Sequence, residues 1–358
     1  MNHDTRNLTF VPTVCAAIAT VLLMGVLPCQ SIAQDTVYQF REDKKPLRLR
    51  GTIEQISPQG VAIKTDSGTQ NVSTDQIVRV VFEGQPSTLT RARERFEDAR
   101  FSECVEALDK IKDDPAGQKW QPEYDYLRAV VNAELSLSGG NVTAQDAGNQ
   151  VNQFLNTHSQ SYLKFPAMER LGKLLFAFGR MKNASQSFET LIQSGFPKFQ
   201  RSGAYWQGAS EREQGNFDKA ASLFKKIGAI KPGGPESETW QLMAACQVAR
   251  CEGELGNKDA AVASLKKIIK EQNPDNSRLF ATAFNSLGSV YLKQNQLKEA
   301  RTEFLKTELL YPTAVDEHAE ALYYLTKIWA QLNENDRAIQ ARETLKNLYP
   351  NSWWATRE

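Results

Sequence analysis

A recurring pair of small residues is the feature that most constrains what this chain can fold into. Glycine or asparagine stands five residues before an alanine at five places: Gly179 with Ala184, Gly215 with Ala220, Gly256 with Ala261, Asn295 with Ala300, and Asn333 with Ala338. Glycine and asparagine tolerate the left-handed conformation that ends a helix, and alanine lets the next helix pack closely. Because the alanines recur every 36 to 41 residues, the pattern predicts a solenoid of stacked helical hairpins.

Paired amphipathic segments extend this pattern over the rest of the chain from about residue 88 onward. They predict seven hairpins, at residues 88–112, 121–157, 161–194, 199–231, 236–272, 276–311 and 315–349. The corresponding small packing residues are Cys104, Ala147, Ala184, Ala220, Ala261, Ala300 and Ala338. The first two hairpins are the least regular. The sequence therefore predicts a mainly α chain, with six or seven helical hairpins across residues 88–358.

One unit, from Ala281 to Pro312, shows the repeat most fully. Its first helix carries Phe284, Leu287, Gly288 and Tyr291, and its second helix carries Ala300 and Phe304. This arrangement resembles the tetratricopeptide repeat, and the resemblance extends over about three quarters of the chain. Another unit departs from it at Thr326, where the family usually has glycine. The resemblance implies an α-solenoid whose first helices line a concave face and which binds other proteins.

Residues 37–84 have a different composition and precede the helical region. Short segments rich in Val, Ile and Thr are separated by turn signals, at Leu47–Ile56, Gly60–Lys64, Thr69–Ser73 and Ile77–Phe82. Four or five strands in so short a stretch predict a small antiparallel β-barrel, similar to Sm-like or SH3-like barrels. An Sm-like barrel would suggest RNA as a ligand, whereas an adaptor or capping domain is the expectation for an exported chain.

The first 33 residues have the pattern of an export signal. A largely apolar run at residues 10–27 is followed by Ser31-Ile32-Ala33, which offers small residues at the cleavage positions. Pro12 interrupts the run, so its continuous part is shorter than the roughly 20 residues that span a bilayer. We expect a signal peptide at residues 1–33, and a mature chain in the periplasm or cell envelope without a membrane span. Lipid attachment at Cys29 is an alternative.

Charge and motif content exclude several other classes of function. The net charge is +1, and a nucleic-acid-binding protein normally shows a basic excess. The sequence has no motif for a nucleophile, a phosphate loop or a metal ligand set, so we predict no catalytic residue, no cofactor and no metal. His158 and His318 stand alone, and a lone helical histidine is more often a surface residue than a catalyst. Cys104, Cys246 and Cys251 are expected to be buried or idle thiols.

The resemblance to tetratricopeptide arrays also places a recognition surface on the first helices. The positions that line the concave face in that family fall on Lys173, Tyr205, Arg212, Arg250, Asn285, Tyr323 and Lys327. Cations interleaved with tyrosines suit an acidic or carboxylate-bearing peptide, through charge-assisted hydrogen bonds and cation–π contacts. The other interpretation is an ordinary solvated helix face that happens to be basic.

The last aromatic pair, Trp353-Trp354, follows Ser352, which is a good helix N-cap. We interpret it as a terminal turn that covers the last apolar face of the array, with a docking anchor as the alternative. Together these patterns predict a non-enzymatic, exported scaffold that presents a concave groove to partner polypeptides. The alternative is a module that binds an envelope polymer, such as peptidoglycan or an acidic polysaccharide.

Overall fold

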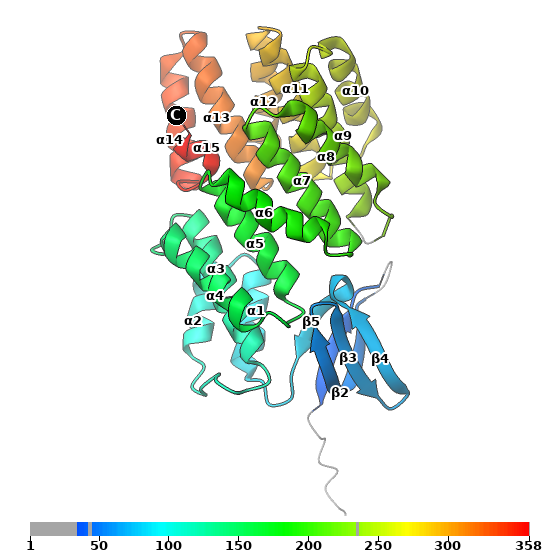
Figure 1. Ribbon diagram of the computed structural model, residues 1–358. Helices are drawn as coiled ribbons and strands as arrows, with labels where there is room; N and C mark the ends of the chain where they lie inside the picture. Colours follow the sequence, from blue (N-terminus) through cyan, green and yellow to red (C-terminus); the bar gives the residue numbers. More distant parts are fainter. Residues whose placement is uncertain (1–33, 42–44, 234–235, 358) are drawn as a thin grey trace, which may run out of the picture. The chain divides into compact units, whose positions relative to one another are not determined.

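A computed structural model describes residues 34–41, 45–233 and 236–357 of the chain. The expected signal peptide and Cys29 lie outside the described residues. From residue 34 onward the chain forms one compact unit, in which an antiparallel sheet precedes fifteen helices (Figure 1). Among the described residues, none of the helices combines the length and the apolar character needed to cross a membrane.

The sheet contains five strands in the order β4-β3-β2-β1-β5. Their bounds are β1 Asp35–Gln39, β2 Leu47–Ser57, β3 Gly60–Thr65, β4 Gly68–Ser73 and β5 Ile77–Val81. The long strand β2 pairs through its first half with β1 and through its second half with β3, and the register shifts between Ile53 and Gln55. Near this shift Gly51 approaches the backbone of β3 so closely that a Cβ would lie 1.9 Å from the Lys64 carbonyl oxygen.

The expectation of a small β-barrel needs correction, because the sheet is open. The final strand β5 pairs with β1 and not with β4, so β4 and β5 occupy opposite edges of the sheet. The short 3-10 turn at Thr74–Gln76 carries the chain from one edge toward the other. The prediction of a small antiparallel β region before the helices is confirmed, and β1 is the strand that the sequence pattern did not single out.

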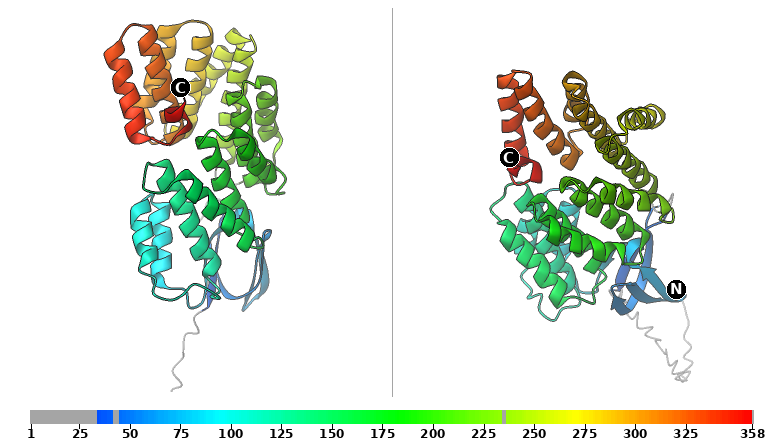
Figure 2. Two further views of the ribbon diagram at one scale, coloured as in Figure 1. Left: turned by 60° about the vertical axis from the view of Figure 1, so that its left-hand side comes forward. Right: turned by 45° about the horizontal axis from the view of Figure 1, so that its top comes forward.

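The helices form seven consecutive hairpins and a final short turn, as the sequence predicts. The first helices of the hairpins are α1 Ser87–Glu97, α3 Gln121–Leu137, α5 Lys164–Ala177, α7 Pro197–Glu213, α9 Ser237–Glu254, α11 Ser277–Lys293 and α13 Val315–Gln331. The second helices are α2 Phe101–Asp109, α4 Ala144–Thr157, α6 Met181–Ile192, α8 Phe217–Ala229, α10 Lys258–Glu271, α12 Leu297–Leu310 and α14 Asn335–Leu348. The short turn is α15, at Trp353–Thr356. Figure 2 shows that the two helices of each hairpin lie side by side and that each hairpin packs on the next one.

Local sterics explain why the repeat produces these hairpins. Asn295 and Asn333 adopt φ values of 59° and 60°, so each reverses the chain between the two helices of its hairpin. Inside the hairpins, Gly288 has no room for a side chain, since a Cβ there would lie 2.8 Å from the ring of Phe304. The seven predicted packing residues, from Cys104 to Ala338, are all buried. The repeat signature is therefore a packing constraint between paired helices.

The sheet and the first hairpins share one apolar core. Val37, Ile63 and Val80 of the sheet belong to the same cluster of buried residues as Leu89 of α1 and Val130 of α3. A second cluster runs from Phe165 through the later hairpins to Ala341, and Met168 and Leu175 of α5 pack against both clusters. The sheet therefore packs directly on the first hairpins of the array.

Candidate functional site

A cavity of about 430 Å³ lies against the first helices of the hairpins. Residues of α3, α5, α7, α9 and α13 line it, together with the segment that follows α14. Its aromatic wall consists of Phe101, Phe176, Tyr205, Trp206, Tyr349, Trp353 and Trp354. This volume lies within the range of about 300–1,000 Å³ that is common for ligand pockets. We call this feature the concave cavity, because the first helices surround it as the repeat resemblance implies.

The seven residues predicted to form the recognition surface separate into two groups. Lys173, Tyr205 and Arg212 line the concave cavity, and Arg250 and Asn285 are buried nearby through contacts with Glu320 of α13. The remaining two, Tyr323 and Lys327, also lie on α13 but do not line the cavity. Tyr323 is half-buried against Trp354, and Lys327 is exposed with its ammonium group 5.4 Å from the centroid of the Tyr323 ring.

A buried ion cluster at the cavity centres on Arg250 of α9. Its Nη1 donates to Glu320 Oε1 at 2.6 Å, and its Nη2 donates to the Tyr324 hydroxyl at 3.3 Å. Asn285 of α11 donates to the other oxygen of Glu320 at 3.1 Å. Burial opposes the charge on Arg250, but the carboxylates of Glu320 and Glu213 leave its pKa raised. Arg250 therefore stays protonated and is neutralised inside the array.

Arg212 of α7 completes this cluster with its neighbour Glu213. Arg212 donates from Nε and Nη2 to Glu213 Oε1 at 3.1 and 2.9 Å, and from Nη1 to Gln247 of α9. Burial alone would raise the pKa of Glu213, but the nearby cations Arg212, Arg250 and Arg357 outweigh it and lower that pKa. Two arginines thus balance two carboxylates, those of Glu213 and Glu320, in the core of this cluster.

The expectation of an open basic face therefore needs correction at its main residues. Arg212 and Arg250 are buried and paired, and Lys173 has a carboxylate partner in Glu169 at 3.0 Å. Their positive charge is already used by carboxylates of the chain itself. The spacing of residues in the repeat places these side chains toward the concave side, but it carries no information about partners on other hairpins. These cations supply little free charge for an acidic partner.

The segment Pro350–Arg357, which we call the docking segment, contacts hairpins far away in the sequence. Asn351 Nδ2 donates to the Ser136 carbonyl of α3 at 2.6 Å, and Trp353 Nε1 donates to Glu213 Oε2 at 3.3 Å. Arg357 forms an ion pair with the same Glu213 oxygen. At the end of α5, Gly179 lies so close that a Cβ would be 2.8 Å from the Trp353 ring. The segment therefore forms part of the wall of the concave cavity.

The two tryptophans of the docking segment have different surroundings. Trp354 is buried in a cluster with Ala319, Leu322 and Leu345 of the last hairpin. Trp353 is only partly buried and faces α5 and α7. Ser352 caps the short helix α15 by accepting from the Ala355 backbone N–H at 3.2 Å, as the sequence predicts. Trp354 thus covers the last apolar face, whereas Trp353 reaches across to other hairpins.

Glu317 of α13 is a further titratable group on the wall of the concave cavity. Thr282 of α11 donates to its Oε1 at 3.1 Å, and the Nε atom of Arg278 lies 3.9 Å from the same oxygen. Burial raises the pKa of Glu317 to about 7, because the charged form loses its hydration. The wall of the cavity therefore carries a buried carboxyl group that is protonated more readily than an exposed glutamate.

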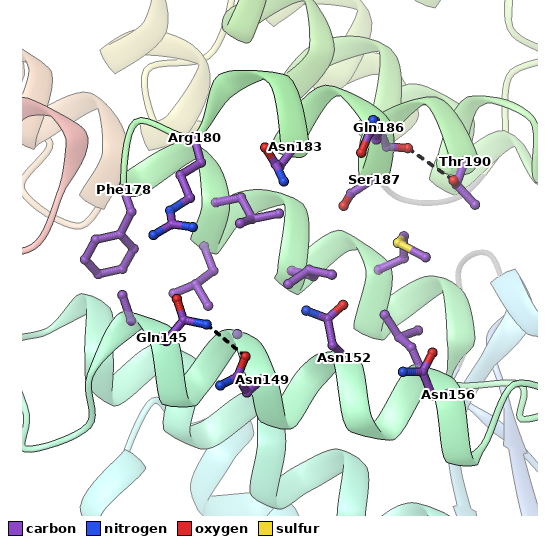
Figure 3. A pocket seen from close by; sticks show the side chains of 17 residues that line it. Gln145, Asn149, Asn152, Asn156, Phe178, Arg180, Asn183, Gln186, Ser187 and Thr190 are labelled. Carbon is purple, nitrogen blue, oxygen red and sulfur yellow. Dashed lines mark hydrogen bonds between the residues drawn. The ribbon is translucent and has the colours of Figure 1, made fainter.

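A second cavity of about 430 Å³ lies between the second helices α4 and α6, with α5 as its floor (Figure 3). Its rims carry the guanidinium of Arg180 and many amides and hydroxyls, from Gln145, Asn149, Asn152, Asn156, Asn183, Gln186 and Thr190. Its floor is apolar, with Met168, Leu171, Leu174 and Leu175. Sequence reasoning missed this groove, although the amides at positions 145, 149, 152 and 156 recur with helical spacing.

The two described histidines and the three described cysteines are at least half-buried in the fold. His318 is buried, which lowers its pKa, and its Nδ1 lies 2.7 Å from the Tyr349 hydroxyl, so the expected surface location is wrong for this histidine. His158 is half-buried and bonds to Asp125 at 2.8 Å. All three described cysteines are buried and free, as predicted, and burial raises the pKa of Cys246 to about 12. Within residues 34–41, 45–233 and 236–357, no group of three His, Cys, Asp or Glu side chains could hold a metal ion.

Comparison with known proteins agrees with this architecture. Two tetratricopeptide-repeat family models match the chain, one at residues 167–235 and 249–315 and the other at residues 320–352. The structure is similar to that of a tetratricopeptide repeat protein from Parabacteroides merdae, with 16% identity and a TM-score of 0.50. That match covers 73% of this chain and 92% of the other. No curated protein matches the sequence.

A second solved structure shares the fold at lower identity. It is that of a Rap protein complexed with Competence and Sporulation Factor, with 10% identity and a TM-score of 0.50, covering 75% of this chain and 77% of the other. Such identities establish the fold alone. The family matches, the paired helices and their glycine–phenylalanine contacts together show that the chain contains tetratricopeptide repeats between residues 167 and 352.

Proposed function

We propose that this chain is a non-enzymatic scaffold of the cell envelope that binds a segment of a partner polypeptide in its concave cavity. The observation that carries the proposal is the docking segment, because a stretch of polypeptide already lies against this surface through side-chain and backbone hydrogen bonds. The Rap protein, which shares the fold, is known in complex with a bound factor, and this supports a binding role for the array.

The composition of the cavity wall supports a polypeptide as the ligand. Aromatic rings such as Phe176, Tyr205 and Trp206 offer large rigid contact surfaces, which are favoured at protein interfaces. The charged groups behind them are paired, so little additional desolvation is required when a partner covers them. An array of hairpins keeps such a surface preorganised, which reduces the entropy lost on binding.

Site-specific photocrosslinking in cells tests this function. A photoreactive residue is placed at Val315, which lines the cavity and is 55% exposed, and in a matched control at Ile339, which is 56% exposed on α14 outside the cavity. We expect a discrete set of polypeptides to crosslink at Val315 and not at Ile339. Identical products at both positions, or none at Val315, would contradict the proposal.

The envelope location rests on the export pattern in residues 1–33. Fractionation followed by intact-mass analysis of the chain provides the test. We expect a mature protein in the envelope fraction that begins near Gln34, whereas a full-length protein that stays in the cytoplasm would contradict this part of the proposal.

A further inference from the structure

Glu213 on α7 uses its two carboxylate oxygens for two different purposes. Oε1 accepts from Arg212, and this contact belongs to the buried ion cluster of the array. Oε2 accepts from the Trp353 indole at 3.3 Å and from the Arg357 guanidinium. The sequence separations are 140 and 144 residues. One oxygen is therefore committed to the fold, while the other is occupied by a segment from the far end of the array.

The docking segment also contains a natural division between an anchor and a releasable part. Trp354 is buried in its own hairpin, whereas Trp353 is partly buried and the Arg357 side chain is 31% exposed. The ion cluster without Arg357 already has two cations, Arg212 and Arg250, and two carboxylates. Release of Arg357 therefore leaves the buried charges balanced, and Glu213 Oε2 becomes free to accept other donors.

We propose that Glu213 and its surroundings form a recognition site for a polypeptide carrying an aromatic side chain and, four residues later, a cation. The side chains of Trp353 and Arg357 are the resident occupant of this site, and a partner binds by displacing them. This inference rests on the proposed function and defines the chemistry of its partner. The recognising group is a carboxylate, so the favoured partner is aromatic and basic, in place of the acidic partner expected from the sequence.

Neighbouring contacts fit the same ligand chemistry. The guanidinium of Arg357 lies 5.4 Å from the Trp353 centroid and 5.5 Å from the Tyr323 centroid, so a cation is placed among aromatic rings as well as beside a carboxylate. The Trp353 ring fills the space over Gly179 at the end of α5. An incoming aromatic–cation pair can reproduce both sets of contacts, whereas an acidic peptide would face the carboxylate of Glu213.

A labelled synthetic peptide with the sequence of residues 350–357 tests the site by fluorescence anisotropy. The full chain is compared with its Trp353→Ala, Arg357→Ala double variant, in which the resident occupant is weakened. We expect the peptide to bind the variant about tenfold more tightly, since a site that is occupied most of the time loses apparent affinity in proportion to its free fraction. Equal affinity for both proteins would overturn the proposal.

A second pair of variants isolates the carboxylate. Glu213→Gln, made in the double variant, should abolish peptide binding. Glu211→Gln on the same helix is the matched control, since the Glu211 side chain is also buried but bonds to Lys219 and Asn216. A peptide with the Arg357→Glu change should fail to bind, and tighter binding by that peptide would contradict the proposed chemistry.

Hydrogen exchange of the unmodified chain supplies a readout that needs no variant. Saturating peptide should speed the exchange of residues 350–357 while α14 keeps its protection, and unchanged exchange of that segment would overturn the displacement.

The inference can fail separately from the proposed function. If crosslinks at Val315 form and the peptide does not compete with them, the cavity binds partners but not through this chemistry. If neither crosslinks at Val315 nor peptide binding is observed, the proposed function is contradicted as well.

Discussion

Arg250 offers the sharpest test of the buried ion cluster, because its environment differs most from the open basic face that the sequence suggested. Arg250 is 4% exposed, and Glu320 is its main partner at 2.6 Å. Replacing Arg250 by methionine keeps most of the volume but leaves Glu320 without its closest cation. Removing one member of a buried ion pair costs about 3–5 kcal/mol. Arg212 lies 3.9 Å from Glu320 and Asn285 still donates to it, so we expect the lower end, about 3 kcal/mol.

Urea unfolding followed by circular dichroism measures this change in the free energy of unfolding. Lys327→Met is the control, since Lys327 is exposed and a surface substitution changes stability by at most about 0.5 kcal/mol. Adding Glu320→Leu to Arg250→Met removes the orphaned carboxylate and should restore much of the loss. If Arg250→Met costs no more than Lys327→Met, the ion cluster does not stabilise the array and the reasoning is refuted.

Two further predictions concern the pH response and the repeat itself. The pKa of Glu317 is raised to about 7 by burial, so its folded form binds a proton more tightly than the unfolded chain. The stability that this proton contributes is fully present below about pH 4.5 and is lost as the pH rises through 7. Between pH 5 and 7.5 the free energy of unfolding of the unmodified chain should therefore fall by on the order of 2 kcal/mol more than that of the Glu317→Gln variant. Equal pH slopes in urea unfolding would contradict this. Asn333→Val should lower the free energy of unfolding by about 1–2 kcal/mol, because valine is strained at a φ of 60°. Asn333→Gly should not lower it, because glycine adopts this conformation without strain. If the two variants are equally stable in urea unfolding, the turn is not strained by valine.

The hairpins could be predicted because their determinants are local. Asn295, Ala300 and Phe304 act within one unit, through a left-handed turn and a contact with Gly288 of the partner helix. The strands were also recognisable from their composition and turns. Sheet closure was not, because it requires β5 to pair with β4 as well as with β1, and the open and closed sheets are compatible with the same alternation of apolar residues.

The site was less predictable because its contacts join distant units. Arg250 and Glu320 are 70 positions apart, and their pairing depends on how the three helices between them, α10, α11 and α12, are placed. A helix face rich in cations looks the same in sequence whether its charges are free or neutralised by another repeat. Of the residues that the repeat register points to, Lys173, Tyr205 and Arg212 line the concave cavity. Their ionic partners, and the arrival of Trp353 at Glu213, required the folded chain.

The docking segment also changes how the ends of the array can open. In a repeat array each unit contacts only its neighbours, so terminal hairpins fray independently of the middle. Here the last hairpin continues into a segment that bonds to α3 and α7. When the last hairpin unfolds locally, the contacts of the docking segment with α3 and α7 therefore break as well. Local unfolding of this hairpin thus becomes cooperative with motion around Glu213. A ligand that displaces the segment would uncouple the two regions, so occupancy of the cavity would be felt as increased fraying at the far end of the array.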